Sequence, residues 1–422
     1  MGYHLRPHAA GSRPLQIKPR EFIFLVAAMM ACQALAVDAM LPAFPVIGRA
    51  FDVAGENHLQ LIVTAYITGL GLGQLAWGPI SDRYGRRRVL LVGLALYIVA
   101  ALLGGFAHSF RELLAWRFVH GAAAASVIVS RSMIRDLYEG RHMARVMSLT
   151  FIVFLMVPML APGFGQLLLW AGPWQMLFVA FAVFATVVWA WVLRRLPETL
   201  HPEYRMTLTV GHLVAAVRKV VLEPASLWYT LAITCVFGSI MAYVGMVQSI
   251  FQDFFHRPAL MPGIFALCSA GMAVASFTNS RIVGRFGMRR TSHAGLLVFI
   301  LLTGLHALLA RAGFETLPSF VLLQAASLAC LGFLGANFGA MAMEAMGEVA
   351  GVAASLQGSI STIGGALVGA LIGYFFNGTT VPLAAGAFCC GVVALGCVLM
   401  AEGGKLFRAH NVLATDLVSS MH

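Results

Sequence analysis

The sequence predicts an all-α integral membrane protein whose twelve transmembrane helices form two six-helix pseudo-repeats. The chain of 422 residues is 60% hydrophobic and only 11% charged, whereas a soluble protein has about 25% charged residues. Apolar runs recur along its length, and each is long enough to cross a hydrocarbon core about 30 Å thick. A short basic motif also occurs twice, about two hundred residues apart, which indicates two homologous halves.

Twelve apolar segments are expected to span the membrane, and most are joined by short connections. The longest polar interval, 196–224, follows the sixth segment and separates the halves. Within it, residues 211–221 alternate apolar and basic residues at helical spacing, which predicts a short helix on the inner membrane surface. The expected spans are 22–47, 59–80, 89–108, 112–135, 144–170, 174–195, 225–251, 261–283, 290–310, 317–342, 349–375 and 382–402.

The basic residues predict how these spans are oriented. With the N-terminus inside, 22 of the 28 Lys and Arg residues fall in inner segments and four in outer connections, in agreement with the positive-inside rule. The net charge of +11 is thus explained by topology and contact with anionic lipid, not by nucleic-acid binding. The predicted regions are a cytoplasmic N-terminal tail (1–21), an N-terminal six-helix bundle (22–195), a cytoplasmic linker (196–224), a C-terminal six-helix bundle (225–402) and a cytoplasmic C-terminal tail (403–422).

The first 21 residues contain no apolar core, so they are expected to be a cytoplasmic tail and not a signal peptide. The first span then serves for insertion. We expect a multi-pass protein of the cell inner membrane with both termini in the cytoplasm.

The basic motif runs from Gly78 to Arg88 (GPISDRYGRRR), between spans two and three. Its second copy, residues 284–290 (GRFGMRR), lies between spans eight and nine. Both copies contain the pattern Arg-aromatic-Gly-x-Arg-Arg, but Gly284 stands where the first copy has Asp82. In a membrane protein, two such halves usually form an alternating-access transporter.

The first copy resembles the loop motif GxxxDRxGRR of the major facilitator superfamily. Other stretches are similar to the Bcr/CflA group of drug:proton antiporters in that superfamily. The resemblance implies the major facilitator fold, with its helices around a central cavity, and alternating access. The stretches are DAMLPAFP from Asp38 in span one, RFVHGAAAA from Arg117 and RSMIRDLY from Arg131 in span four, and AGVAASLQG from Ala350 in span eleven.

Span five departs from the antiporter pattern of this family. It reads PMLAPGFGQ from Pro158 to Gln166, whereas the family's motif shows Gly-Pro followed by a pair of glycines. Pro158, Pro162 and Gly165 keep the helix bend and the close contact, but Ala161 and Gln166 replace two expected glycines. Antiport is favoured, and a proton symporter or uniporter for a small metabolite stays an alternative.

Asp38 is the one acidic residue of the seventeen that lies deep in an expected span. A carboxylate in hydrocarbon is costly unless it is paired, hydrated or protonated, so such residues usually have a function. Burial disfavours the charged form of a carboxyl group and a nearby cation favours it, so a group between these influences can bind and release a proton. A hydrogen-bonded structural acid before Pro42 is the alternative.

Arg117 in span four is the expected partner of Asp38 in proton coupling. At 1.5 Å per residue, Asp38 lies about 24 Å and Arg117 about 22 Å from the inner face of the membrane. The resemblance implies that both spans line the central cavity. A surface arginine that reaches the outer interface is the alternative for Arg117. Arg131 lies nearer the inner end of the span, and a side chain that reaches the inner interface explains it as well as a role in transport does.

Other residues are expected to line the cavity. His120 lies one turn after Arg117 and titrates near neutrality, although a structural histidine is the alternative. Uncharged polar groups within spans either bind substrate or bridge two helices, and methionines adapt to varied shapes. The predicted substrate-binding residues are Met30, Gln33, Tyr66, Arg117, His120, Tyr243, Gln248, Asn337 and Gln357.

The first loop motif is predicted to be a conformational latch. By the resemblance, Asp82 meets the N-terminal end of span eleven, where backbone N–H groups favour a negative charge, and Arg86 pairs with Asp136. Such contacts exist only when the inner face is closed, so they bias the equilibrium between two states. A topogenic basic loop is the alternative, but it explains neither the acid nor the glycines. The predicted latch residues are Gly78, Asp82, Arg83, Gly85, Arg86 and Asp136.

The residues and the resemblance together predict a proton-coupled efflux transporter for a small, partly apolar compound such as a drug or antibiotic. Its expected partners are that compound, protons and membrane lipid, and the protein is expected to be a monomer. No enzyme is expected, because no metal cluster, no serine with a base and no phosphate-binding loop is visible. The seven cysteines lack metal-ligand spacing, so no cofactor is expected.

Overall fold

The computed structural model describes residues 17–53, 58–137, 157, 160–200, 210–344, 346 and 350–407. All regular secondary structure in these residues is helical. Ten helices in these ranges are long and apolar enough to cross a membrane. Of the other two expected spans, the fourth consists of two shorter helices and the fifth is described in part, as the apolar helix Leu160–Ala171. The all-α membrane fold is confirmed, and these helices are consistent with twelve spans.

The N-terminal group of helices extends from α1 to α8. The first expected span is interrupted, since α1 (Pro19–Asp38) ends at the predicted proton site and the chain continues through a short 3₁₀ helix, η1 (Leu41–Ala43). The other described members are α2 (Phe44–Ala50), α3 (Leu61–Tyr84), α4 (Arg86–Gly105), α5 (Phe110–Ala122), α6 (Ser126–Leu137), the helix Leu160–Ala171, and α8 (Gln175–Arg195).

The C-terminal group of helices extends from α10 to α15, and α9 (Val210–Leu222) precedes it as the short helix expected in the interval between the halves. Its first helix ends in a π-helical turn, η4 (Ile250–Phe254). The other members are α10 (Pro224–Ser249), η5 (Pro258–Leu260), α11 (Met261–Phe286), α12 (Met288–Arg311), α13 (Leu317–Ala342), α14 (Ala350–Tyr374) and α15 (Val381–Ala401).

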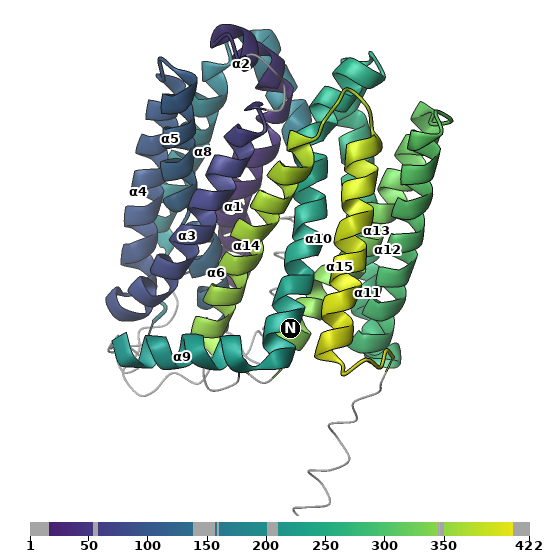
Figure 1. Cartoon of the computed structure of the whole chain (residues 1–422). Helices are drawn as coiled ribbons and strands as arrows, with labels where there is room; N and C mark the ends of the chain where they lie inside the picture. Colours follow the sequence, from purple (N-terminus) through teal and green to yellow (C-terminus); the bar gives the residue numbers. More distant parts are fainter. Residues whose placement is uncertain are drawn as a thin grey trace, which may run out of the picture.

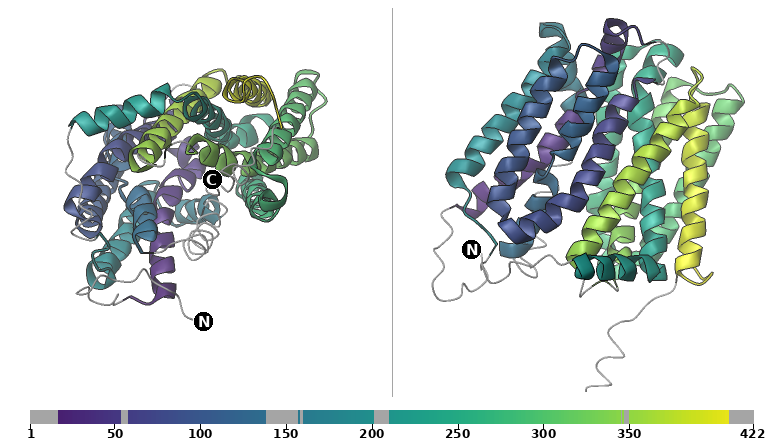
Figure 2. Two further views of the ribbon diagram at one scale, coloured as in Figure 1. Left: turned by 90° about the horizontal axis from the view of Figure 1, so that it is seen from below. Right: turned by 60° about the vertical axis from the view of Figure 1, so that its left-hand side comes forward.

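The two groups stand side by side, and α3 and α14 form the main contact between them (Figure 1). α14 leans across the middle of the molecule, where it also packs along α10. α9 crosses beneath the lower ends of the upright helices. The views from below and from the side show the same arrangement, with the purple-to-blue helices on one side and the green-to-yellow helices on the other (Figure 2).

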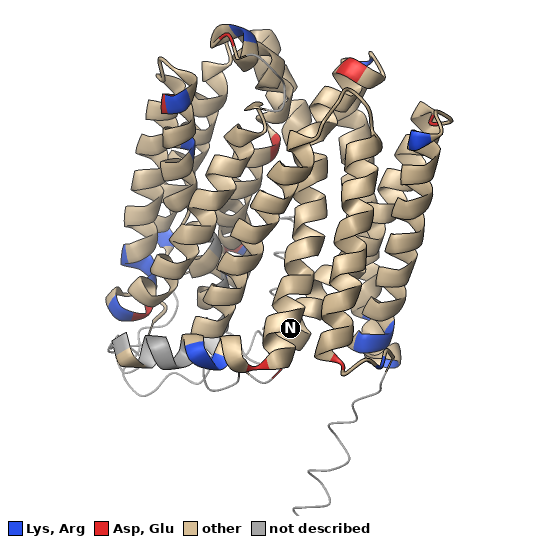
Figure 3. Ribbon diagram, in the orientation of Figure 1, with Lys and Arg blue, Asp and Glu red and all other residues tan. Residues whose placement is uncertain are grey.

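The surface of the helices suits a lipid environment. Large apolar side chains are exposed on the outward faces, for example Leu301 and Leu308 on α12, which are 72% and 68% exposed. Charged residues gather toward the two ends of the helices and are sparse in their middle parts (Figure 3). Such extensive apolar surface would be unusual in a protein that stays in water, whereas it matches the interior of a bilayer.

The two copies of the loop motif adopt the same turn. Gly85 ends α3 and precedes α4 with φ +99°, and Gly287 ends α11 and precedes α12 with φ +83°. Both angles lie in the region where a side chain is unfavourable, so glycine is required at each position. The predicted repeat is therefore present in the backbone as well as in the sequence.

The fourth expected span differs from the continuous helix that its apolar composition suggests. It breaks at residues 123–125, between α5 and α6. The indole Nε1 of Trp77 on α3 donates a hydrogen bond of 2.6 Å to the carbonyl oxygen of Ala122, so that oxygen is satisfied by a neighbouring helix. In a membrane, a helix can break only where other groups take over its backbone hydrogen bonds, and Trp77 supplies one of them.

Candidate functional site

Asp38 lies at the interruption of the first span and is 6% exposed. It is the last residue of α1, and it is followed by the turn at residues 39–40 and by η1, which contains Pro42. Proline has no N–H to donate and favours a break in the helix before it. The sequence therefore places the carboxyl group of Asp38 and the helix break at the same depth in the expected membrane span.

Arg117 on α5 is completely buried and binds the end of α1. Its Nη2 donates a hydrogen bond of 2.9 Å to the carbonyl oxygen of Ala36, and its Nε donates one of 3.3 Å to the carbonyl oxygen of Ile62. The last carbonyl groups of a helix have no partner within the helix and carry partial negative charge. The guanidinium therefore caps the C-terminal end of α1, two residues before Asp38.

No ion pair joins Asp38 to Arg117 in the part of the chain that the structure describes. The two groups are nevertheless held at one helix end, since Arg117 binds the carbonyl oxygen of Ala36 in the last turn of α1. Arg117 and Asp38 are thus linked through the last turn of α1 and not by a direct contact.

Aromatic side chains surround the guanidinium of Arg117. Its Cζ lies 4.5 Å from the ring centroid of Tyr66, within the range of a cation–π interaction. Its Nη1 lies 3.2 Å from Nδ1 of His120, whose ring centroid is 4.0 Å from that of Tyr97. Tyr97 donates its hydroxyl hydrogen to the carbonyl oxygen of Cys32 at 2.7 Å. The structure therefore joins three predicted site residues, Tyr66, Arg117 and His120, in one buried cluster.

The tautomer of His120 follows from these contacts. Arginine has only donors, so Nδ1 of His120 accepts and the neutral ring carries its hydrogen on Nε2. Among the described residues, this Nε2 has no hydrogen-bond partner, whereas the hydroxyl group of Tyr66 lies against that of Tyr97. Buried polar groups normally have partners, so Nε2 of His120 is available to water or to a bound molecule.

Span five packs directly on the break after Asp38. A Cβ atom at Gly165, in the helix Leu160–Ala171, would lie 2.1 Å from the carbonyl oxygen of Ala39. Only glycine permits this approach. The close contact expected at Gly165 is therefore present; Pro162 lies in the same helix, and Pro158 lies outside the described residues.

The other predicted substrate-binding residues are dispersed. Met30 is buried and Gln33 is half-buried on α1, whereas Tyr243 and Gln248 lie on α10. Tyr243 stacks on Phe265 with ring centroids 5.6 Å apart. Its hydroxyl group lies against the thiol of Cys268, and Oε1 of Gln248 has no partner among the described residues.

Two predicted residues instead bridge helices. The amides of Asn337 and Asn279 exchange hydrogen bonds of 2.9 and 3.3 Å between α13 and α11. Nε2 of Gln357 donates to Oγ of Ser226 at 2.7 Å and to the carbonyl oxygen of Ala342 at 2.9 Å. In this conformation, the side chains of Asn337 and Gln357 therefore join helices of the C-terminal group.

The first loop motif forms a compact ion-pair cluster around Arg86, which is 2% exposed. Its Nη1 lies 2.5 Å from Oδ1 of Asp82, and its Nε lies 2.9 Å from Oδ2 of Asp136. The pair that we expected between Arg86 and Asp136 is present. Arg83 instead lies against the ring of Tyr84, 5.3 Å from its centroid.

Glu198 is a member of this cluster that the sequence did not suggest. Its carboxylate accepts from the backbone N–H of Arg86 at 2.8 Å and from that of Arg87 at 3.2 Å, at the N-terminal end of α4. A Cβ at Gly85 would lie 2.5 Å from Oε2 of Glu198. The residue follows span six and was assigned to the linker; its position just after an inner helix end is the signal that identifies it.

The second loop motif pairs with acidic residues from elsewhere in the C-terminal group, although Gly284 stands where the first copy has Asp82. Arg289 on α12 pairs with Glu344 at 2.8 Å and with Glu402 at 2.6 Å. Glu402 also accepts a hydrogen bond of 2.7 Å from the hydroxyl group of Tyr229. The C-terminal group therefore compensates for the missing acid with residues from the ends of α13 and α15, which the comparison of the two loops alone does not reveal.

Comparison with known proteins agrees with this geometry. The family model of the Major Facilitator Superfamily matches residues 26–369. An uncharacterized MFS-type transporter of Bacillus subtilis, YdgK, is 29% identical over 88% of this chain and 92% of its own. A bicyclomycin resistance protein homolog of Haemophilus influenzae is 28% identical over 86% of this chain and 91% of its own. A chloramphenicol resistance protein of Pseudomonas aeruginosa is 26% identical over 92% of both chains.

Solved structures share the fold. The human organic anion transporter MFSD10 (TETRAN) superposes with a TM-score of 0.65 at 20% identity, over 92% of this chain and all of its own. A D-xylose-proton symporter superposes with a TM-score of 0.70 at 14% identity, over 92% of this chain and 98% of its own. At these identities the likeness shows the arrangement of the helices alone.

The contact between Gly165 and Ala39 makes a testable prediction. Gly165→Ala must move the backbone around the break in the first span, and we expect a loss of stability of about 1–3 kcal/mol. The purified protein should aggregate at a lower temperature in a detergent-based thermal assay. Gly163→Ala is the matched control, because a Cβ at Gly163 meets nothing within 4 Å. Equal melting temperatures for the two variants would contradict the contact.

Proposed function

The chain belongs to the Major Facilitator Superfamily, and from this premise we propose that it exports a small, partly apolar compound in exchange for protons. The observation that carries the proposal is the buried acid at the end of a broken membrane helix whose last turn an arginine caps. Relatives whose names include bicyclomycin and chloramphenicol resistance support a drug or antibiotic as the compound.

Asp38 is the proposed proton-binding group. When its carboxyl group is ionised, the positive charge of Arg117 compensates for it across the end of α1. When the carboxyl group is protonated, the carbonyl oxygens of Ala36 and Ile62 still bind the guanidinium. Arg117 therefore has a stable position in both protonation states, while the net charge of the site changes by one.

Substrate is proposed to bind near buried polar side chains that lie in both groups of helices. Among the described residues, Nε2 of His120 beside Arg117 and Oε1 of Gln248 on α10 have no partner, and the hydroxyl groups of Tyr66 and Tyr243 add further polar groups. Met30 and Gln33 on α1 complete the proposed set. Cavities with apolar walls and a few polar groups accept compounds of varied shape.

The loop motif is proposed to close the inner face through α3 and α14. A Cβ at Gly78 would lie 2.8 Å from Oγ of Ser355 on α14, and Oγ of Ser359 donates to the carbonyl oxygen of Gly71 at 2.6 Å. These paired positions show that α3 and α14 run antiparallel. Asp82 lies one turn beyond Gly78 on α3, at the level of the first residues of α14, where unpaired N–H groups favour its charge.

A proton symporter or uniporter for a small metabolite is the second candidate. Ala161 and Gln166 in span five replace two glycines that resemblance to the antiporters predicts. The direction of proton movement separates the candidates. When substrate is added to energised everted vesicles, an antiporter releases protons from the lumen into the medium, whereas a symporter moves protons and substrate the same way.

We expect Asp38→Asn to abolish proton-driven export while the protein still inserts, because the change removes the titratable charge and keeps the size. Chloramphenicol and bicyclomycin are the first compounds to test in everted vesicles. Asp52→Asn, an exposed position at the start of the connection after α2, is the matched control and should retain export. Uphill export by the Asp38→Asn variant would exclude Asp38 from coupling.

We expect a disulfide between Gly78→Cys and Ser355→Cys to stop transport reversibly. The ideal Cβ at Gly78 lies 3.8 Å from Cβ of Ser355, which is the mean separation in disulfides. The matched control joins Thr234→Cys to Gly364→Cys, whose Cβ atoms are also 3.8 Å apart but belong to one group of helices. That bond should leave transport unchanged, and a reducing agent should restore the first variant. Continued uphill transport by the oxidised first variant would mean that α3 and α14 need not separate.

A further inference from the structure

Gln60 directly precedes α3, and its side chain reaches between helices of the C-terminal group. Its side chain is 3% exposed. A Cβ at Gly373 would lie 1.6 Å from its Oε1, and one at Gly245 would lie 3.1 Å from the same atom. The two glycines, on α14 and α10, therefore form a notch that fits the carboxamide and excludes any larger residue.

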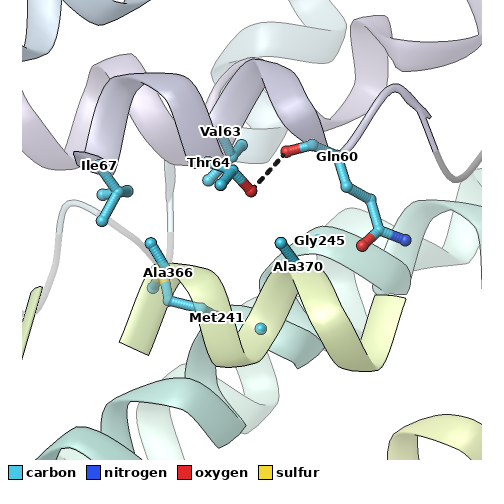
Figure 4. Close-up of a pocket in the computed structure, with 9 residues that line it drawn as sticks. Gln60, Val63, Thr64, Ile67, Met241, Gly245, Ala366 and Ala370 are labelled. Carbon is cyan, nitrogen blue, oxygen red and sulfur yellow. Dashed lines mark hydrogen bonds between the residues drawn. The ribbon is translucent and has the colours of Figure 1, made fainter. Parts of the chain in front are cut away.

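A small pocket continues from this notch along α3 (Figure 4). Its wall is apolar apart from Gln60 and Thr64, and the Oγ1 of Thr64 donates to the backbone oxygen of Gln60 at 3.1 Å. The positive-inside rule places the Gln60 end of α3 outside, because the basic loop follows the other end. Gln60 therefore lies between the pocket and the outer face. The pocket is lined by Gln60, Val63, Thr64, Ile67, Met241, Gly245, Ala366, Gly369 and Ala370.

The carboxamide of Gln60 is held by shape and not by a full set of hydrogen bonds. Among the described residues, its Nε2 has no partner. A buried donor without a partner disfavours the state in which it occurs, and contact with water removes that penalty. The notch thus holds the side chain in place while the unsatisfied N–H favours its release.

The same end of the molecule contains the segment that follows Asp38. η1 packs against α10, the helix that contributes Gly245 to the notch. Among the described residues, Gln60 and the residues just beyond the proposed proton site therefore both contact the C-terminal group at this end. Opening the outer face must break both.

We infer that Gln60 is an outer gate residue, whose carboxamide closes the pocket by docking between Gly245 and Gly373. The inference rests on alternating access in the proposed function. It adds that a neutral side chain closes this face, whereas the ion pairs around Arg86 and Arg289 at the inner ends each lie within one group of helices. Closure of this face should accordingly depend little on salt.

Accessibility of Thr64→Cys from outside tests the gate. In intact cells, a membrane-impermeant maleimide should label this cysteine slowly, since Gln60 covers it. We expect Gln60→Ala and Gly373→Ala each to raise the labelling rate about tenfold, because a minor open population becomes substantial. The parent without Thr64→Cys gives the background from the native cysteines. Unchanged labelling in both variants would overturn the inference.

Gly364→Ala is the matched control on α14. A Cβ at Gly364 meets Cγ2 of Thr234 at 2.6 Å, within the C-terminal group, so it perturbs packing without touching the notch. The labelling rate of Thr64→Cys with Gly364→Ala should equal that of Thr64→Cys alone. If Gly364→Ala raises the rate as much as Gln60→Ala does, general loosening, and not the gate, exposes the cysteine. Gln60→Asn, one methylene shorter, should open the face without a change of polarity. The assay needs neither substrate nor a proton gradient, so it stands apart from the outcome of the Asp38→Asn experiment.

Discussion

The structure depends on how the free backbone carbonyl groups at the end of one broken membrane helix find hydrogen-bond partners. Hydrocarbon offers no hydrogen bonds, so the carbonyl groups that α1 leaves free at its end must find partners within the protein. Arg117 supplies one of these hydrogen bonds, to Ala36, together with positive charge. The position of α5 is thereby fixed against the end of α1 that carries Asp38.

Glycines bring neighbouring helices close enough for this arrangement. Gly121, one turn after Arg117, would meet the carbonyl oxygen of Tyr66 at 1.9 Å if it had a Cβ, and Gly69 would meet that of Phe118 at 2.0 Å. α3 and α5 therefore approach backbone to backbone, as small residues allow in membranes. This approach brings the ring of Tyr66 over the guanidinium. With Gly165 against Ala39, close contacts hold the helices on both sides of the break.

Hydropathy and the repeated loop were sufficient to predict the membrane helices and the matching turns at Gly85 and Gly287, because these features are local or repeat along the chain. The pairing of Arg86 with Asp136 was predicted from the resemblance to the superfamily. Contacts between distant residues were not predictable in this way. Glu198 and Glu402 appear in the sequence as ordinary acids after the last helix of each half, and the turn at Gly85 or the side chain of Arg289 gives them their partners. Gln357 has the composition of a cavity residue, but its neighbours make it a bridge between helices.

The two contacts proposed to close the molecule belong to the same helix. α3 bears Gly78 near its inner end, and Gln60 directly precedes its outer end, and both residues contact α14 in this structure. A tilt of α3 could therefore separate one end from α14 while the other end stays in contact. The first half of α3 packs on α5 through Tyr66 and Gly69, beside Arg117. A change of charge at Asp38 therefore acts close to the point about which α3 would tilt. Under the proposed function, this position explains how one proton, bound at a broken helix, can bias both faces of the membrane protein.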